Sequence, residues 1–386
     1  MNKRYEELDS LRGLAALFVV FVHMYQVIPT NKVSKIIFEY SPLRLFISGG
    51  ESVILFFVLS GFVLSLPYFN NKHSSYSSFI IKRVCRIYLP YLFAVIIAIG
   101  GKELFYTGKI NGATAWINLS WSAPINIQVI KSHLLMLGSF MSNLNPVIWS
   151  LVHEMRISII FPLVMLLLIR LDWKKGIALG VIVSVMAIIL YNVFKPASTG
   201  TEYVASLNYT AMFIIGALLA KYRSHIAQKF TSLSNKIKVL AIAFGLVSYL
   251  FVHPSFVINA FHTIPPFYRT VIDSWFVTLG AVVLIIFAIN STFMSRVLRI
   301  HFVNFLGKIS YSLYLIHIVI FLSMFQLLRG VLPTGMILIA SLFISFVVAT
   351  LMYHFIEKPS IKLGRILTTQ PKKINSLETE KASRIA

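Results

Sequence analysis

The sequence predicts an all-α membrane protein, with about ten transmembrane helices packed in one bundle. Three observations support this fold class: 57% of the 386 residues are hydrophobic, only 12% are charged, and the mean hydropathy is +0.80. Soluble domains carry about 25% charged residues, so this chain has too little polar surface for a water-facing particle. A bilayer core of about 30 Å is crossed by roughly 20 apolar residues, and the chain contains many runs of that length.

Ten apolar segments are the candidates for these helices, and the first is long enough to span rather than to serve as a cleavable signal peptide. The sixth is short and is interrupted by Asn208 and Thr210. In chain order the limits are Leu11–Ile28, Gly50–Tyr68, Ile80–Gly101, Val147–Ile169, Gly176–Phe194, Leu207–Ala220, Val239–His253, Val271–Ile289, Ile309–Leu328 and Met336–Phe355. We expect one transmembrane domain over residues 1–360 and a basic, disordered tail over 361–386 at the cytoplasmic membrane surface.

The positive charge of the chain predicts its orientation. Lys and Arg number 35 against 13 Asp and Glu, a net charge of +22. In a soluble protein this excess would suggest nucleic acid, but in a membrane protein basic residues gather in cytoplasmic loops. With the N-terminus inside, these spans place 25 Lys and Arg inside, nine outside and Arg156 within a span. We therefore expect both termini in the cytoplasm, membrane lipid as the surroundings, and no nucleic-acid partner.

The longest predicted outer loop runs from Lys102 to Asn145 and carries Trp116 and Trp121. It fits a cap that binds an acceptor, and equally a re-entrant or interfacial element without chemistry. The single cysteine, Cys85, excludes an intrachain disulfide and a multi-cysteine metal site. The segment 153–157 (HEMRI) is not the H-E-x-x-H zinc motif, so no metal site is predicted.

Ionisable side chains inside the predicted spans are the candidates for function, because each costs roughly 2.5–3.5 kcal/mol at the bilayer centre. His23 follows Arg12 by eleven residues. At about 100° and 1.5 Å per residue the two share a helix face and lie roughly 16 Å apart. Asp9, one turn before Arg12, would orient it through an i,i+3 ion pair. Anchoring at the membrane edge explains Arg12 and Asp9 equally well, and a packing role would explain His23 taken alone.

Glu154 and a pair of arginines complete this set. Glu154 lies roughly 10–12 Å from the outer end of the fourth span, the depth expected for His23. A carboxylate there would fix the imidazole tautomer and raise its basicity, as a general base requires; the alternative is a pair with Arg156 or His153. Arg83 and Arg86, at i,i+3, would hold nucleotide phosphates together with Arg12, or would only anchor the membrane edge.

Six segments, in this order and spacing, carry a family resemblance. They are Leu8–Leu17 (LDSLRGLAAL) with His23 completing an R-x10-H pattern, Phe56–Phe62 (FFVLSGF), Arg83-x-x-Arg86, Trp149–Glu154 (WSLVHE) followed by Phe161-Pro162, Ile309–His317 (ISYSLYLIH) and Ile356–Pro359 (IEKP). Over nearly its whole length the chain resembles the acyltransferase family 3 membrane proteins, the bacterial O-acyltransferases of surface polysaccharides. The resemblance implies a ten-helix fold in the bacterial cytoplasmic membrane, here without the SGNH-type domain that some members carry.

The resemblance also implies an activity. An acyl group, most often acetyl, would pass from cytoplasmic acyl-CoA to a hydroxyl group of an extracytoplasmic glycan, or to a separate SGNH-type transferase. Acyl-CoA is then a donor substrate, and no tightly bound cofactor is expected. His23 would be the general base or a transient acyl carrier, with Glu154 orienting it. Arg12, Arg83 and Arg86 would hold the donor's phosphates.

Two further points stay open from the sequence. Ser60, Tyr311 or a backbone N–H would stabilise the oxyanion, and the sequence does not choose among them. The alternative function is a transporter or exporter of a glycan intermediate, because buried Arg, Glu and His also mark substrate paths. Transporters often contain inverted repeats, and the sequence shows none, which favours the enzyme.

Overall fold

Each predicted apolar segment falls largely within a helix of the computed structural model, which describes residues 5–27, 29–71 and 73–369. In this part of the chain nine helical runs are long and apolar enough to cross a membrane, and one bent pair of helices brings the number to ten. The same residues contain no strand beyond a single isolated bridge. The all-α, multi-pass membrane bundle is therefore confirmed.

The ten candidate spans differ from the predicted segments mainly at their ends. They are α1 (Glu6–Val27), α3 (Gly49–Phe69), the run Tyr76–Phe105 (α4, η2 and α5), the run Pro146–Leu168 (η3 and α8), α9 (Trp173–Phe194), α10 (Tyr203–Lys221), the pair α12 (Asn235–Leu250) and α13 (Pro254–Phe261) bent by 48°, α14 (Pro266–Asn290), α16 (His301–Leu328) and the run Thr334–Thr368 (α17, η4 and α18). Shorter helices connect them: α2 (Lys32–Glu39), η1 (Pro42–Ile47), α6 (Ala115–Leu119), α7 (Ile127–Leu135), α11 (Arg223–Ser232) and α15 (Thr292–Leu298).

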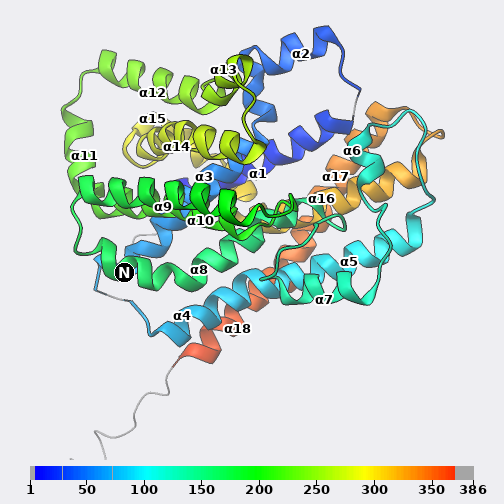
Figure 1. Cartoon of the computed structure of the whole chain (residues 1–386), viewed down its shortest axis with the longest axis horizontal. Helices are drawn as coiled ribbons and strands as arrows, with labels where there is room; N and C mark the ends of the chain where they lie inside the picture. The colour runs from blue at the N-terminus through cyan, green and yellow to red at the C-terminus, as the bar shows by residue number, and fades with distance from the viewer. Residues whose placement is uncertain (1–4, 28, 72, 370–386) are drawn as a thin grey trace, which may run out of the picture.

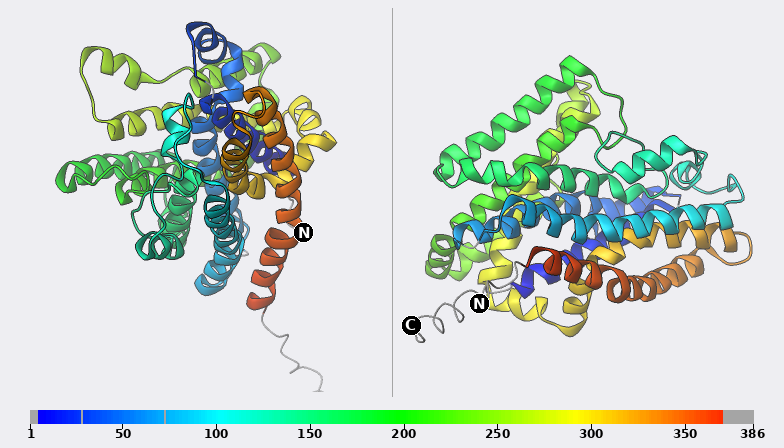
Figure 2. Two further views of the ribbon diagram at one scale, coloured as in Figure 1. Left: turned by 90° about the vertical axis from the view of Figure 1, so that its right-hand side faces the viewer. Right: turned by 90° about the horizontal axis from the view of Figure 1, so that it is seen from below.

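The long helices run side by side, with α11 at one end of the bundle and α6 at the other (Figure 1). Two further views show α18 near the end of the bundle where α1 begins (Figure 2). We call that end, marked by the start of α1 and the end of α18, the terminal face. The opposite end, where α3 begins and α6 and α7 lie, is the loop face. An even number of crossings returns the chain to the terminal face.

Glycines allow two central helix pairs to pack backbone against backbone. A Cβ added at Gly61 of α3 would overlap the backbone of Phe213 in α10, and one at Gly13 of α1 would overlap the backbone of Gly307 in α16. Helices in lipid gain little from apolar burial alone, so close van der Waals contact between small residues holds them together. These contacts fix α1, α3, α10 and α16 as the centre of the bundle.

The short sixth segment becomes the most enclosed helix among the candidate spans, since 83% of the most apolar window of α10 is buried. Its interrupting Asn208 is fully buried, accepts a hydrogen bond from Ser184 at 2.9 Å and donates one to Ser274 at 3.3 Å. A helix surrounded by protein needs no apolar surface for lipid, and its polar groups find partners on neighbouring helices. Low hydropathy here reflects a central position.

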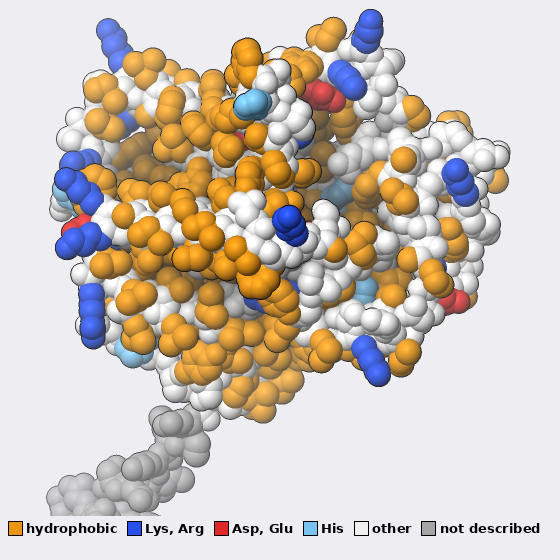
Figure 3. Space-filling model, viewed as in Figure 1, with side chains coloured by type: hydrophobic (Ala, Val, Ile, Leu, Met, Phe, Trp, Pro, Cys, Tyr) orange, Lys and Arg blue, Asp and Glu red, His pale blue; other side chains and the backbone are white. Residues whose placement is uncertain are grey.

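The outside of the bundle is apolar across its middle. Large hydrophobic side chains there are exposed, including Leu163 at 62% and Phe343 at 69%. Figure 3 shows hydrophobic side chains across the middle of one face and Lys and Arg gathered at its left edge, where Figure 1 places α11. Lipid tails cover such a belt, and the basic rim suits a charged membrane surface.

The predicted start of a disordered tail at residue 361 is wrong. The last span continues through a π-helical segment, η4 (Tyr353–Glu357), into α18 (Lys358–Thr368). Gly364 of α18 lies so close to Cys85 that a Cβ at this glycine would be 3.0 Å from the Cys85 Cβ. Charged residues lower the hydropathy of α18, but packing against the third span keeps it helical. The rest of the predicted tail, 370–386, lies outside the described residues.

Labelling from outside the cell should distinguish the two faces. On a Cys85→Ala background, a cysteine at Ser376 should resist a membrane-impermeant maleimide in intact cells, because the charge asymmetry predicts that this end lies in the cytoplasm. A cysteine at Lys109, exposed between α5 and α6, should react, and permeabilised cells should label at both positions. Labelling at Ser376→Cys in intact cells would reverse the predicted orientation.

A candidate active site inside the bundle

A cavity of about 1170 Å³ lies among α1, α3, the α4–α5 run, α8, α16 and the α17–α18 run. It opens at the terminal face, where Asn70, Lys362 and Arg365 line it, and it reaches inward to Val53 and Tyr314. Seven of the predicted site residues line it: Asp9, Arg12, Ser60, Arg83, Arg86, Glu154 and Tyr311. The eighth, His23, lies beyond its inner end.

The mouth of this cavity is basic. Arg223, Lys308, Lys358, Lys362 and Arg365 line it close to the terminal face, in addition to the predicted arginines further in. Cationic side chains along a recess with low-dielectric walls concentrate anions there. In the sequence these five residues do not stand out, because each one alone resembles ordinary anchoring at a membrane surface. The recess they share becomes visible only when α18 folds back against α4.

Inside the cavity Glu154 pairs with Arg83. The Arg83 Nη2 to Glu154 Oε1 distance is 2.7 Å, and Ser60 donates a hydrogen bond to the same oxygen at 3.2 Å. Arg83 Nε also donates to Ser158 at 3.1 Å. The predicted contact between Glu154 and His23 is therefore wrong for this structure. A largely buried carboxylate gains more from a charged, hydrogen-bonding guanidinium than from a neutral imidazole.

The alternative partners of Glu154 are occupied elsewhere. Arg156 donates to the carbonyl oxygens of Leu137, Gly138 and Thr201 at 2.6–3.0 Å, and its guanidinium stacks on a tyrosine ring. His153 is fully buried and lies 3.0 Å from the Gly200 carbonyl oxygen. The Arg156 side chain fastens two loop segments to α8, a structural role. Within the described part of the chain, neither Arg156 nor His153 forms a hydrogen bond with Glu154.

The three predicted arginines differ in how available they are to a ligand. Arg83 is 8% exposed and its guanidinium is already paired with Glu154, which argues against a phosphate contact there. Arg12 forms the predicted i,i+3 ion pair with Asp9 at 3.5 Å and donates to the Leu59 carbonyl at 3.3 Å. Arg86 is exposed in the cavity and makes no hydrogen bond or ion pair within the described part of the chain. Arg86 is thus the cation best placed for an incoming anion.

Two π-helical segments face this cavity. The first, η2 (Val84–Tyr88), carries Arg86, and the second, η4, ends at Glu357, which accepts a hydrogen bond from Ser312 at 2.6 Å. Tyr311 donates to the Ile87 carbonyl oxygen of η2 at 2.8 Å. Such one-turn π segments occur frequently at functional sites. The hydroxyl hydrogens of Tyr311 and Ser60 are both donated to protein acceptors here, so neither points to a developing oxyanion.

His23 contacts a second histidine, His317 of α16. His23 Nδ1 lies 2.8 Å from the Val19 carbonyl oxygen and 3.2 Å from His317 Nε2, and His317 Nδ1 lies 2.9 Å from the Leu313 carbonyl oxygen. Carbonyl oxygens only accept, so the hydrogen-bond network assigns the proton to Nδ1 in both neutral rings. The single Nδ1–H of His23 is then shared between the Val19 carbonyl oxygen and His317 Nε2, with the carbonyl oxygen the nearer acceptor. Among the described residues nothing forms a hydrogen bond with His23 Nε2, whose lone pair is therefore free.

The histidine pair lies between the cavity and the loop face. On the cavity side, the ring centroids of Tyr314 and His317 are 6.3 Å apart, and Tyr314 lines the end of the cavity. On the other side, Trp116 of α6 stacks on His23 with centroids 5.4 Å apart and planes at 25°. The predicted outer loop 102–145 therefore contains short helices, and it covers His23 with an aromatic ring.

His317 is the site residue that the sequence reasoning missed. It stood inside one of the segments that carry the family resemblance, and it is a histidine in an apolar span, the same signal that selected His23. Its contact joins residues 294 apart in the chain, so helix periodicity within one span does not reveal it.

The fold and this interior site define a multi-pass membrane protein with a basic recess and buried ionisable groups. The chain belongs to acyltransferase family 3, since that family's sequence model, described as an acyltransferase domain, matches residues 5–354. The protein is therefore a membrane acyltransferase. No protein with a curated description and no solved structure matches the chain.

Breaking the buried pair should cost more stability than removing the exposed arginine. Arg83→Ala leaves Glu154 charged and unpaired, a loss of about 3–5 kcal/mol for a buried pair. Arg86→Ala removes no hydrogen bond or ion pair among the described residues and should leave the thermal unfolding of the detergent-purified protein unchanged, as should the control Lys82→Ala in the same helical run. Equal unfolding temperatures for Arg83→Ala and Arg86→Ala would show that the pair does not support the fold.

Proposed function

We propose that this acyltransferase moves an acetyl group from cytoplasmic acetyl-CoA to a hydroxyl group of an extracytoplasmic glycan. The observation that carries the proposal is the basic cavity, which opens at the terminal face and ends one aromatic ring away from the His23–His317 pair. A long, flexible donor with a polyanionic head and a reactive tail fits a recess that is cationic at its mouth and leads toward a potential base. In this proposal the terminal face is cytoplasmic.

The donor's phosphates would bind the free cations of the recess. Arg86, Lys362 and Arg365 face the cavity near its mouth, and Arg12 lies on the same side. The pantetheine arm would run inward past Ser60 and Tyr311 toward Tyr314, a distance comparable with the roughly 16 Å rise from Arg12 to His23. Arg83 would act through Glu154 and Ser158, holding the wall of the channel rather than a phosphate.

His23 would act as the general base through its Nε2 lone pair. The acceptor hydroxyl gives its proton to Nε2 while its oxygen bonds to the thioester carbonyl carbon. The C–S bond then breaks, and His23 returns the proton to the CoA sulfur. The alternative role, attack of Nε2 on the thioester to form an acyl-histidine, uses the same lone pair and would leave a label on His23.

His317 is a positioning residue in this scheme. By accepting from Nδ1–H it helps to hold His23 in the tautomer whose Nε2 is basic, and it stabilises the imidazolium that forms when Nε2 takes a proton. It occupies the place that the sequence analysis gave to Glu154. A neutral partner is cheaper to bury in a membrane span than a carboxylate.

Donor binding should depend on the free cations of the recess. Arg86→Ala should weaken acetyl-CoA binding roughly 10- to 150-fold, because a charge-assisted hydrogen bond contributes about 1.5–3 kcal/mol. The double variant Lys362→Ala/Arg365→Ala, which removes two charges, should weaken acetyl-CoA binding at physiological salt more than Arg86→Ala does. Calorimetry on the purified protein measures both, with Lys175→Ala, an exposed lysine outside the cavity, as the control. Wild-type affinity in both variants would place the donor elsewhere.

The histidine variants test the chemistry. His23→Ala should abolish transfer of radiolabelled acetyl from acetyl-CoA to envelope glycan while donor binding stays normal. His317→Leu should lower turnover about 10- to 100-fold, the loss typical when the hydrogen-bond partner of a metal-binding histidine is removed. It should also move the acid limb of the pH–rate profile to lower pH, since the imidazolium loses its acceptor. The side-chain carbonyl oxygen of His317→Gln can accept from His23 Nδ1–H. This variant should therefore recover part of the turnover and part of the original pH profile.

Two results would contradict this scheme. Glycan acetylation by His23→Ala in cells without a native copy would remove His23 from the chemistry. A His317→Leu enzyme with a normal pH profile and only reduced thermal stability would reduce His317 to a packing residue.

A further inference from the structure

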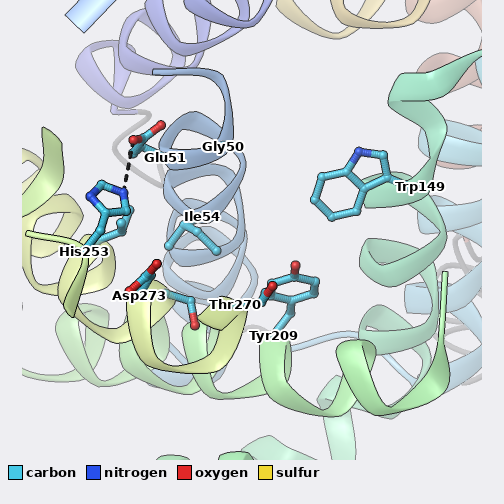
Figure 4. Close-up of a pocket in the computed structure, with 10 residues that line it drawn as sticks. Gly50, Glu51, Ile54, Trp149, Tyr209, His253, Thr270 and Asp273 are labelled. Atoms are coloured by element: carbon cyan, nitrogen blue, oxygen red, sulfur yellow. Dashed lines mark ion pairs between the residues drawn. The ribbon is translucent and has the colours of Figure 1, made fainter. Parts of the chain in front are cut away.

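A second pocket, of about 210 Å³, lies at the loop face, separate from the basic cavity. The first turns of α3, α8 and α14 border it together with α10 and the break between α12 and α13 (Figure 4). Its lining residues are Gly50, Glu51, Ile54, Trp149, Tyr209, His253, Thr270, Asp273, Ser274 and Val277. Nothing in the proposed donor chemistry uses these residues.

Two carboxylates in this pocket are held in place by the protein. Glu51 is 8% exposed, and its Oε1 accepts from Arg44 at 3.1 Å and pairs with His253 at 3.3 Å. Asp273 accepts from the backbone N–H of Ser255 at 3.0 Å and from its hydroxyl at 2.6 Å. Glu51 Oε2 has no hydrogen bond within the described residues. Fixed carboxylates with spare lone pairs favour a ligand that donates hydrogen bonds and disfavour an anion.

Two aromatic rings form the opposite side. Trp149 and Tyr209 have centroids 6.1 Å apart, and Figure 4 shows the Tyr209 hydroxyl pointing into the space between Ile54 and Trp149. Neither the Tyr209 hydroxyl nor the Trp149 indole N–H is hydrogen-bonded within the described chain. Buried Tyr and Trp usually find such a partner, so these donors are available to a ligand. Ring faces beside hydrogen-bonding groups suit a molecule with C–H faces and hydroxyl edges.

The pocket and the basic cavity share two helices as a common wall. On α3, Ile54 lines the pocket while its neighbour Val53 lines the cavity. On α8, Trp149 lines the pocket while Ser150 lines the cavity. A ligand in each recess would thus lie against opposite sides of the same two helices. The two recesses are therefore separated only by the thickness of these two helices.

We propose that this pocket binds a terminal sugar ring of the glycan acceptor, an inference that rests on the proposed function. Sugar hydroxyls would donate to Glu51 and Asp273 and accept from Tyr209, and the C–H face of the ring would pack on Trp149. The volume lies below the roughly 300–1,000 Å³ of a pocket for a drug-sized ligand, which fits one ring rather than a chain. The remainder of the glycan would extend from the loop face.

Blocking the pocket with a covalent label tests this inference. On a Cys85→Ser background, Thr270→Cys places a thiol at the pocket's exposed rim, and Thr263→Cys places one on the exposed loop nearby. Right-side-out vesicles are loaded with [14C]acetyl-CoA, and their exposed thiols are modified from outside with a bulky impermeant maleimide. Acetyl transfer is then measured as the 14C that base releases from the glycan. Labelled Thr270→Cys should lose at least tenfold in transfer and keep acetyl-CoA affinity, whereas labelled Thr263→Cys should transfer normally.

The outcomes distinguish this inference from the proposed function. Normal transfer by labelled Thr270→Cys, or a Thr270→Cys thiol that does not react from outside, would overturn the pocket assignment. Absence of transfer from the unlabelled variants and the wild type would instead overturn the proposed function.

A second variant avoids bulky labels. With envelope glycan stripped of acetyl groups by mild base as the acceptor in proteoliposomes, Tyr209→Phe should raise the KM for this glycan several-fold and leave the KM for acetyl-CoA unchanged. The expected loss is that of one neutral hydrogen bond. An unchanged glycan KM would exclude the Tyr209 hydroxyl from acceptor binding.

Discussion

The buried ion pair between Arg83 and Glu154 is the interaction on which the rest of the site depends. It joins the third candidate span to the fourth across the cavity. Ser60 of α3, the second span, donates a further hydrogen bond to Glu154. A charge left alone in this interior would be costly, so each partner requires the other. The π-helical segment begins at the residue after Arg83 and places Arg86 in the same cavity. The pair therefore determines which arginine is structural and which is free for a ligand.

One consequence is that the histidine pair is built without a carboxylate. Since Glu154 is occupied, His23 depends on the Val19 carbonyl of its own helix and on His317 of α16. The close approach of α1 to α16 at Gly13 makes this contact possible, because larger residues would separate the helices. Backbone packing at the terminal face thus sets a hydrogen bond deep in the bundle. Trp116 then covers the same imidazole from the loop side.

The sequence predicted the fold class, and seven of its eight predicted site residues line the cavity, but it did not predict which residues contact one another. Hydropathy located the spans because crossing lipid imposes a length and a composition on each helix. Periodicity paired Asp9 with Arg12 correctly, since both lie on one helix. Glu154 was matched to His23 by depth alone, and depth does not specify which helices are neighbours. α18 was missed because its lysines and arginines, which line the cavity mouth, resemble a solvated tail.

The common wall between the two recesses bears on the choice between an enzyme and an exporter. From pocket to histidine pair the wall is a continuous series of contacts: Trp149 is followed by Ser150, whose hydroxyl is 2.7 Å from that of Tyr314, and Tyr314 lies one turn before His317. An exporter of a glycan would have to open this series widely enough for sugars to pass. A transferase needs only the reacting hydroxyl and the thioester to meet inside the bundle. Buried groups that are hydrogen-bonded across neighbouring helices favour a transferase over an exporter, because a packed interior resists wide opening.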